Sequence, residues 1–115
     1  MVLIASEKED RYSNKAVKSL LENSVPVVAV SRKPGSIGDL TFLTGKPLVD
    51  GIDTLTLYLN PFNQKSFYSY ILELNPRRVI FNPGTENPVL QNLLDEQDIE
   101  WEEACTLVML ATNQF

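Results

Sequence analysis

The sequence predicts a single α/β domain over residues 1–115, with a mostly parallel sheet of about five strands and helices on both faces. Three observations lead to this prediction. Short apolar runs alternate with amphipathic segments along the whole chain, and helix-start signals follow two of those runs. In addition, 115 residues with 43% hydrophobic and 22% charged side chains suit one globular domain.

The first half of the chain predicts two strands and one helix. The apolar run 1–5 indicates a strand, and residues 13–22 carry apolar side chains at helical spacing. Pro26 precedes residues 27–30, whose β-branched and small side chains are typical of a strand buried on both faces. Residues 31–53 are rich in glycine and proline, which predicts an ordered connection without a continuous helix.

The second half repeats the strand and helix unit with the same start signal. Residues 54–59 and 77–81 are β-rich, and each run is followed by an Asn-Pro pair, at 60–61 and 87–88. Such a pair supplies a helix N-cap and a first helical residue. From residue 99 on, we expect a short edge strand and a closing amphipathic helix. Because consecutive parallel strands need right-handed crossovers, this order predicts a three-layer, Rossmann-like domain.

Charge and cysteine content restrict the partners and the location. A net charge of -5 and a pI of about 4.6 argue against nonspecific binding to nucleic acid or to an anionic membrane surface. No apolar run approaches the ~20 residues that a membrane span requires. The single cysteine, Cys105, cannot form an internal disulfide, and the apolar start is too short for a signal peptide. We therefore expect a soluble, cytoplasmic protein.

The charges are unevenly distributed along the chain. Between Arg11 and Gly38 there are five cations and one carboxylate, whereas between Asp95 and Glu103 there are six carboxylates and no cation. The basic part contains the end of the loop after the first predicted strand and the whole loop after the second. Open α/β sheets bind ligands at the carboxyl ends of their strands, so these loops are the first candidates for a site. We expect the acidic stretch to be solvated surface.

The loop after the first predicted strand is a candidate phosphate site. The following helix start offers free backbone N–H groups, and Arg11 and Ser13 add donors. The loop contains no glycine, so it lacks the GxGxxG signature of dinucleotide-binding enzymes. The alternative interpretation is that Ser13 caps the helix and Arg11 is a surface charge.

The loop after the second predicted strand begins with Ser31, Arg32 and Lys33. NAD-binding proteins place a carboxylate at this point to contact the ribose hydroxyls. Two cations instead suit a phosphorylated ribose, such as that of coenzyme A or NADP. The alternative is a solvated basic turn.

The two later loops offer weaker signals. Asn60 is most economically explained as a helix cap. In the fourth loop, Gly84 follows Asn82 and Pro83 and permits a ligand to approach the backbone, while the Asn82 amide suits an amide-rich chain. The alternative for this loop is a turn joined to the cap at Asn87.

The sequence contains few candidate catalytic residues. The chain has no histidine, which removes the commonest general base and the commonest metal ligand. Cys105 lies near the start of the last predicted helix, but with no histidine to pair with it we interpret it as a small core residue. We expect no catalytic residue and no metal site.

Together these landmarks resemble the small, stand-alone CoA-binding domain family, whose fold is also that of the CoA-binding domain in the succinyl-CoA synthetase alpha subunit. The resemblance spans nearly the whole chain. It is carried, in order, by Ile4, Ala5, Ser6, Arg11, Tyr12, Ser13, Ile37, Gly38, Asn60, Pro61, Asn82, Pro83, Gly84 and Cys105.

The resemblance implies binding of coenzyme A or an acyl-CoA. It places the phosphates near the first loop, the adenine nucleotide near the second, and the pantetheine arm along the third and fourth. The cofactor-binding residues it implies are Ser6, Arg11, Tyr12, Ser13, Ser31, Arg32, Lys33, Ile37, Gly38, Asn60, Asn82, Pro83 and Gly84. Two positions differ from the family pattern: glycine is common where Ile4 stands, and arginine where Asn60 stands.

Three functional hypotheses follow. The leading one is a noncatalytic module that binds a small CoA-like molecule. The second, motivated by Ile4 and Asn60, is a Rossmann-like domain that has lost its ligand and serves as an interaction or structural unit, with exposed apolar residues forming a homodimer seam. The third is an NADP-dependent or acyl-transfer enzyme that uses Cys105 or an unidentified partner. The missing histidine and GxGxxG motif argue against this third hypothesis.

Overall fold

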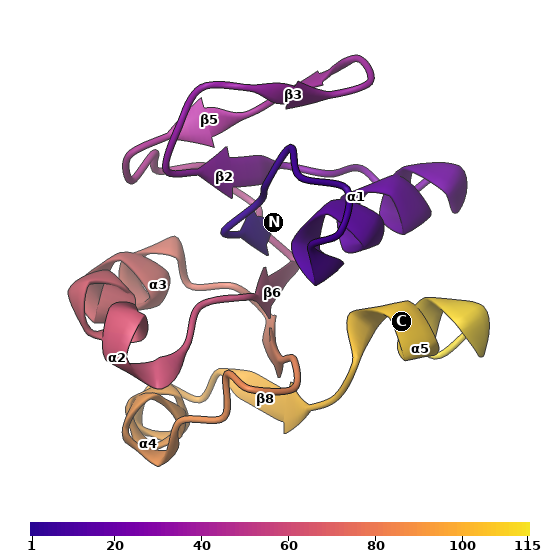
Figure 1. The fold of residues 1–115 in the computed structure, drawn as a ribbon. Coiled ribbons are helices and arrows are strands. Elements are labelled where there is room, and N and C mark those ends of the chain that lie inside the picture. The colour runs from indigo at the N-terminus through magenta and orange to yellow at the C-terminus, as the bar shows by residue number, and fades with distance from the viewer.

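A six-stranded, all-parallel sheet forms the centre of the computed structural model, which describes residues 1–115 (Figure 1). The spatial order of the strands is β5-β2-β1-β6-β7-β8. Every residue of β1, β2 and β6 is buried, as expected of parallel strands covered on both faces. The strands are β1 (Val2–Leu3), β2 (Ala29–Ser31), β5 (Leu43–Thr44), β6 (Thr54–Leu57), β7 (Arg78–Phe81) and β8 (Glu100–Glu103).

Helices cover both faces of the sheet, so the predicted three-layer α/β fold is confirmed. On one face, α1 (Tyr12–Glu22) packs against α5 (Thr106–Ala111). The other face carries α2, α3 and α4, and Figure 1 shows the two groups on opposite sides of the strands. The bounds on this second face are α2 (Pro61–Gln64), a 3-10 turn η1 (Lys65–Phe67), α3 (Tyr68–Leu74) and α4 (Pro88–Glu96).

Two apolar clusters form the core, one on each face of the sheet. In the central strands, neighbouring residues belong to different clusters: Val2 and Ala29 face α1 and α5, whereas Leu3 and Val30 face α3 and α4. This division follows from the two-residue period of a strand, which turns successive side chains to opposite faces. Each of these apolar runs therefore contributes side chains to both apolar clusters.

The predicted Asn-Pro helix starts are confirmed. The Asn60 side chain accepts a hydrogen bond from the Asn63 N–H at 2.8 Å. The Asn87 side chain accepts from the N–H groups of Val89 and Leu90, at 3.1 and 3.4 Å. Each cap satisfies backbone donors that have no partner within the helix, which fixes where the helix begins.

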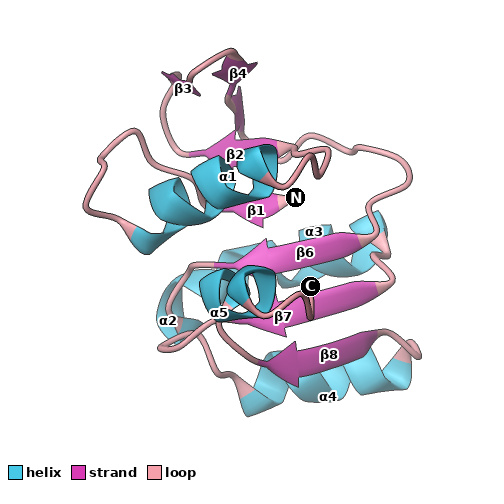
Figure 2. Ribbon diagram, turned by 90° about the vertical axis from the view of Figure 1, so that its right-hand side faces the viewer, coloured by secondary structure: helices cyan, strands magenta, loops and turns pink.

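The connection after β2 contains no helix, as predicted, but it does hold regular structure. A two-stranded antiparallel hairpin, β3 (Ser36–Ile37) and β4 (Leu40–Thr41), lies beyond β2 (Figure 2) and leads into β5, which adds a sixth strand next to β2 (Figure 1). Gly38, with φ +58°, takes the left-handed conformation of the hairpin turn. These two-residue strands are too short to show a period in the sequence. No helix of the structure is long and apolar enough to span a membrane.

Candidate functional site

A cleft of about 640 Å³ opens at the carboxyl ends of the central strands, between the loops that follow β1, β2, β6 and β7. Figure 2 shows β6 and β8 pointing to the left of the view, where these loops gather. From β1 the chain builds outward through β2 to β5, and from β6 it builds in the opposite direction to β8. The cleft therefore lies at the point where the strand order reverses, which is the usual ligand site of an open parallel sheet.

Ten of the thirteen predicted site residues line this cleft. They come from four separate loops, and the fold brings them to one place as the sequence predicts. They are Ser6, Arg11, Tyr12, Ser13, Ser31, Arg32, Lys33, Asn60, Pro83 and Gly84.

Ile37, Gly38 and Asn82 do not line the cleft. Ile37 is 7% exposed and packs in the cluster beneath α1 and α5. Gly38 forms the turn of the hairpin, which the sequence analysis did not expect as a regular element. Asn82 is 2% exposed and lies below the floor of the cleft. Each of the three has a structural role that explains its position.

Asn82 holds the start of α5 against the sheet. Its Nδ2 donates to Thr56 Oγ1 at 2.7 Å and to the Leu57 carbonyl at 3.0 Å, while its Oδ1 accepts from the Thr106 N–H at 2.9 Å. Thr56 and Thr106 are themselves joined, hydroxyl to hydroxyl, at 2.7 Å. Both amide donors of Asn82 are used within the protein, so neither is free for the pantetheine arm that the resemblance placed here.

The start of α1 faces the cleft without a side-chain cap. Arg11 occupies the N-cap position in extended conformation and makes no capping hydrogen bond, so the alternative in which Ser13 caps the helix is wrong. Ser13 is instead the second residue of the helix and is 6% exposed. The first N–H groups of a helix have no intrahelical acceptor and attract anions. This end of the cleft can therefore receive a phosphate.

The loop before α1 is held in place by short contacts. The Ser6 carbonyl accepts from Asn14 Nδ2 at 2.9 Å, and Ser6 Oγ accepts from the Lys8 N–H at 3.1 Å. Asn14 is 1% exposed, and its Oδ1 has no hydrogen-bond partner. The loop therefore has a defined shape at the point where it meets the helix start.

The charge of the cleft is strongly positive. Four cations and one carboxylate line it: Lys8, Arg11, Arg32, Lys33 and Glu7. None of the four cations forms an ion pair within the protein. Arg32 and Lys33 are exposed on the loop after β2, which lines the same cleft as the start of α1. A molecule that carries phosphates at two separate positions matches this distribution.

Gln64 ties the loops after β6 and β7 into one wall of the cleft. Its side chain is completely buried, and Nε2 donates to the carbonyls of Leu59 and Thr85 at 2.7 and 2.8 Å. Its Oε1 accepts from Asn87 Nδ2 at 2.9 Å. Leu59 and Thr85 both line the cleft. The position of this wall therefore depends on one amide side chain that no local sequence pattern indicated.

Several cleft residues were missed from the sequence. Tyr58 and Thr85 line the cleft, and so do Glu7 and Lys8 from the first loop. The first loop itself was predicted, so its remaining polar residues could have been included. Burial raises the pKa of Tyr58 above its ordinary value. Cys105 is half-buried before α5 and does not line the cleft.

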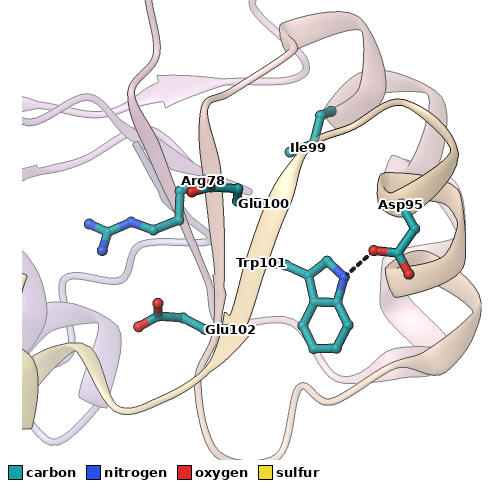
Figure 3. A pocket seen from close by; sticks show the side chains of 6 residues that line it. All are labelled: Arg78, Asp95, Ile99, Glu100, Trp101 and Glu102. Atoms are coloured by element: carbon teal, nitrogen blue, oxygen red, sulfur yellow. Dashed lines mark hydrogen bonds between the residues drawn. The ribbon is translucent and has the colours of Figure 1, made fainter.

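A second, smaller pocket of about 390 Å³ lies at the β8 edge of the sheet (Figure 3). Asp95, Glu100 and Glu102 surround it with a single cation, Arg78. Trp101 Nε1 donates to Asp95 Oδ1 at 2.8 Å, as the dashed line in Figure 3 shows. The excess of carboxylates disfavours a phosphorylated ligand, so the basic cleft remains the candidate site.

Comparison with known protein families identifies the family of this chain. A family model described as "CoA binding domain" matches residues 1–111. The chain belongs to the CoA-binding domain family. The resemblance drawn from the sequence is thereby confirmed, and Ile4 and Asn60, which differ from its pattern, both line the cleft.

Solved structures show the same fold at several levels of identity. A crystal structure described as that of an uncharacterized protein is 45% identical, with a TM-score of 0.96, and the match covers 99% of this chain and 94% of that one. A Thermus thermophilus protein is 20% identical with a TM-score of 0.86, covering 99% and 87%. A hypothetical protein from Pyrococcus horikoshii is 23% identical with a TM-score of 0.79, covering 92% and 75%. No curated protein matches the chain significantly.

Proposed function

We propose that this member of the family binds coenzyme A or an acyl-CoA in the basic cleft and does not catalyse a reaction there. The observation that carries the proposal is that two anion-attracting features line one cleft: the uncapped start of α1 and the exposed turn with Arg32 and Lys33. Coenzyme A carries a pyrophosphate and a separate 3′-phosphate, so it has an anion for each. The cleft volume of about 640 Å³ falls within the range of small-molecule sites.

The composition of the cleft supports a binding role without chemistry. Its lining contains no histidine, cysteine or aspartate, and Glu7 is its only carboxylate. The Glu7 carboxylate accepts a hydrogen bond from the Ser36 N–H. The lining therefore offers neither a cysteine nucleophile nor a histidine base for acyl transfer.

Isothermal titration with CoA, acetyl-CoA and dephospho-CoA tests the proposal. We expect saturable binding of CoA, and weaker binding of dephospho-CoA because it lacks the 3′-phosphate. The double variant Arg32→Ala/Lys33→Ala should weaken CoA binding and remove its advantage over dephospho-CoA. The variant Lys46→Ala/Lys65→Ala removes the same charge outside the cleft lining and should leave binding nearly unchanged. Equal effects of the two double variants would contradict the assignment of Arg32 and Lys33.

The second candidate function is an interaction domain without a ligand. It is favoured by Ile4, which places a branched side chain in the cleft wall, and by Asn60, whose side chain is engaged in capping α2. Exposed apolar residues such as Phe62, which is 76% exposed, would then form a seam between two copies. Absence of heat with millimolar CoA, together with a dimeric mass in light scattering, would support this candidate in place of CoA binding.

A further inference from the structure

One side chain joins the two cationic loops of the cleft. Glu7, in the loop after β1, accepts a hydrogen bond from the backbone N–H of Ser36 at 2.9 Å, although the two residues are 29 positions apart. This is the only hydrogen bond between residues 6–11 and residues 32–36. This hydrogen bond therefore connects the loop that leads into α1 with the turn that follows β2.

Gly35 gives the Glu7 side chain the space it occupies. A Cβ atom built on Gly35 would lie 2.6 Å from Glu7 Cδ and 2.8 Å from Oε1, far inside van der Waals contact. The φ angle of Gly35 is outside the left-handed region, so the turn itself does not require glycine here. Gly35 allows the Glu7 carboxylate to approach the backbone closely.

The turn with Arg32 and Lys33 is thereby fixed at both ends. At one end, β2 is held between β1 and β5 in the sheet. At the other end, the Gly35 carbonyl accepts from the Phe42 N–H at 2.8 Å, and the adjacent N–H of Ser36 is held by Glu7. Arg32 and Lys33 are exposed and make no ion pair, so the backbone of this turn sets the points from which their side chains extend.

We propose that Glu7 is a positioning residue of the cleft: through its hydrogen bond to Ser36 it holds the turn that presents Arg32 and Lys33 to a phosphate. The same carboxylate repels an anionic ligand, so its charge and its hydrogen bond act on affinity in opposite directions. Glutamine keeps an acceptor of the same length without the charge, whereas alanine removes both. Comparing the two variants isolates the hydrogen bond, because their charge is identical.

The affinity test rests on the proposed function. We expect Glu7→Ala to bind CoA about fivefold or more weakly than Glu7→Gln, with a ratio near one for dephospho-CoA. Gly35→Ala should displace the flexible end of Glu7 and weaken CoA binding in the same way, and the double variant should lose no more than Glu7→Ala alone. Glu9→Ala, which removes an equal charge from the same loop outside the cleft lining, is the control. Equal CoA affinities of Glu7→Ala and Glu7→Gln would overturn the proposal.

A readout without ligand keeps the two proposals separable. Amide hydrogen exchange of Ser36, measured by NMR, should be slow in the wild type and in Glu7→Gln, and about fivefold or more faster in Glu7→Ala and Gly35→Ala. The same Ser36 exchange rate in all four proteins would overturn the positioning role, whatever the ligand. If the exchange differences are found but wild-type protein does not bind CoA, the role of Glu7 in holding the turn stands and the proposed function fails.

Discussion

Replacing Gln64 with alanine removes the amide that joins two loops of the cleft. The substitution leaves two buried carbonyls, those of Leu59 and Thr85, without the donor they now share. Asn87 loses one acceptor but still donates to the Tyr68 hydroxyl at 2.8 Å. Each buried carbonyl that loses its partner costs about 1–3 kcal/mol, and the side-chain volume removed adds a cavity term.

We therefore expect Gln64→Ala to lower the free energy of unfolding by about 3 kcal/mol or more, a substantial part of the roughly 5–15 kcal/mol typical of a domain. Urea denaturation followed by circular dichroism measures this loss. Gln91→Ala is the matched control, because Gln91 is also buried but makes a single hydrogen bond, to the exposed Glu103. We expect it to cost about 1 kcal/mol or less. A loss for Gln64→Ala no larger than that for Gln91→Ala would refute the reasoning.

Two further predictions concern groups outside the cleft lining. Asn82→Ala removes three hydrogen bonds below the cleft floor and should lower the free energy of unfolding by about 2–4 kcal/mol in urea denaturation; a loss below about 0.5 kcal/mol would contradict its structural role. Hydrogen bonds from Arg77, and next from Thr54, lower the pKa of Asp53 from 3.8 to about 2. Since the folded-state pKa is the lower one, this stabilisation is present above pH 4 and is lost as the pH falls toward 2. In Asp53→Asn the free energy of unfolding should therefore depend less on pH between pH 4 and 2 than in the wild type, whereas Asp50→Asn should behave like the wild type. The same pH dependence in both variants would contradict a stabilising role of the Asp53–Arg77 pair.

The element order could be predicted because its signals are local. Asn60 and Asn87 each lie within three residues of the donors they cap, so the sequence alone located both helix starts. The run at residues 27–30 likewise indicated a strand buried on both faces, and every residue of β2 is buried. Strand β5 and the hairpin before it were missed because two-residue strands are too short to show a period, and β5 forms only through its pairing with β2.

The position of the cleft could be predicted from a rule that holds for open parallel sheets in general. Loops at the carboxyl ends of parallel strands meet at one edge, and ten predicted residues line the cleft there. Asn82 was assigned to the ligand because it follows a strand, whereas its partners Thr56 and Thr106 are 26 and 24 residues away. Gln64 and Glu7 act through similarly distant contacts, over 21 and 29 residues. Such contacts depend on the three-dimensional fold, so sequence patterns did not show them.

Chemical-shift mapping with CoA tests the central claim most directly. In two-dimensional amide spectra of the labelled protein, CoA should shift the signals of Arg11, Lys33 and Gly84, which line the basic cleft from three loops. Trp101, in the acidic pocket at the β8 edge, should remain unchanged and serves as the internal control. Saturable shifts confined to the cleft are the predicted result. Shifts centred on β8, or none at millimolar CoA, would contradict the assignment of the cleft as a CoA site.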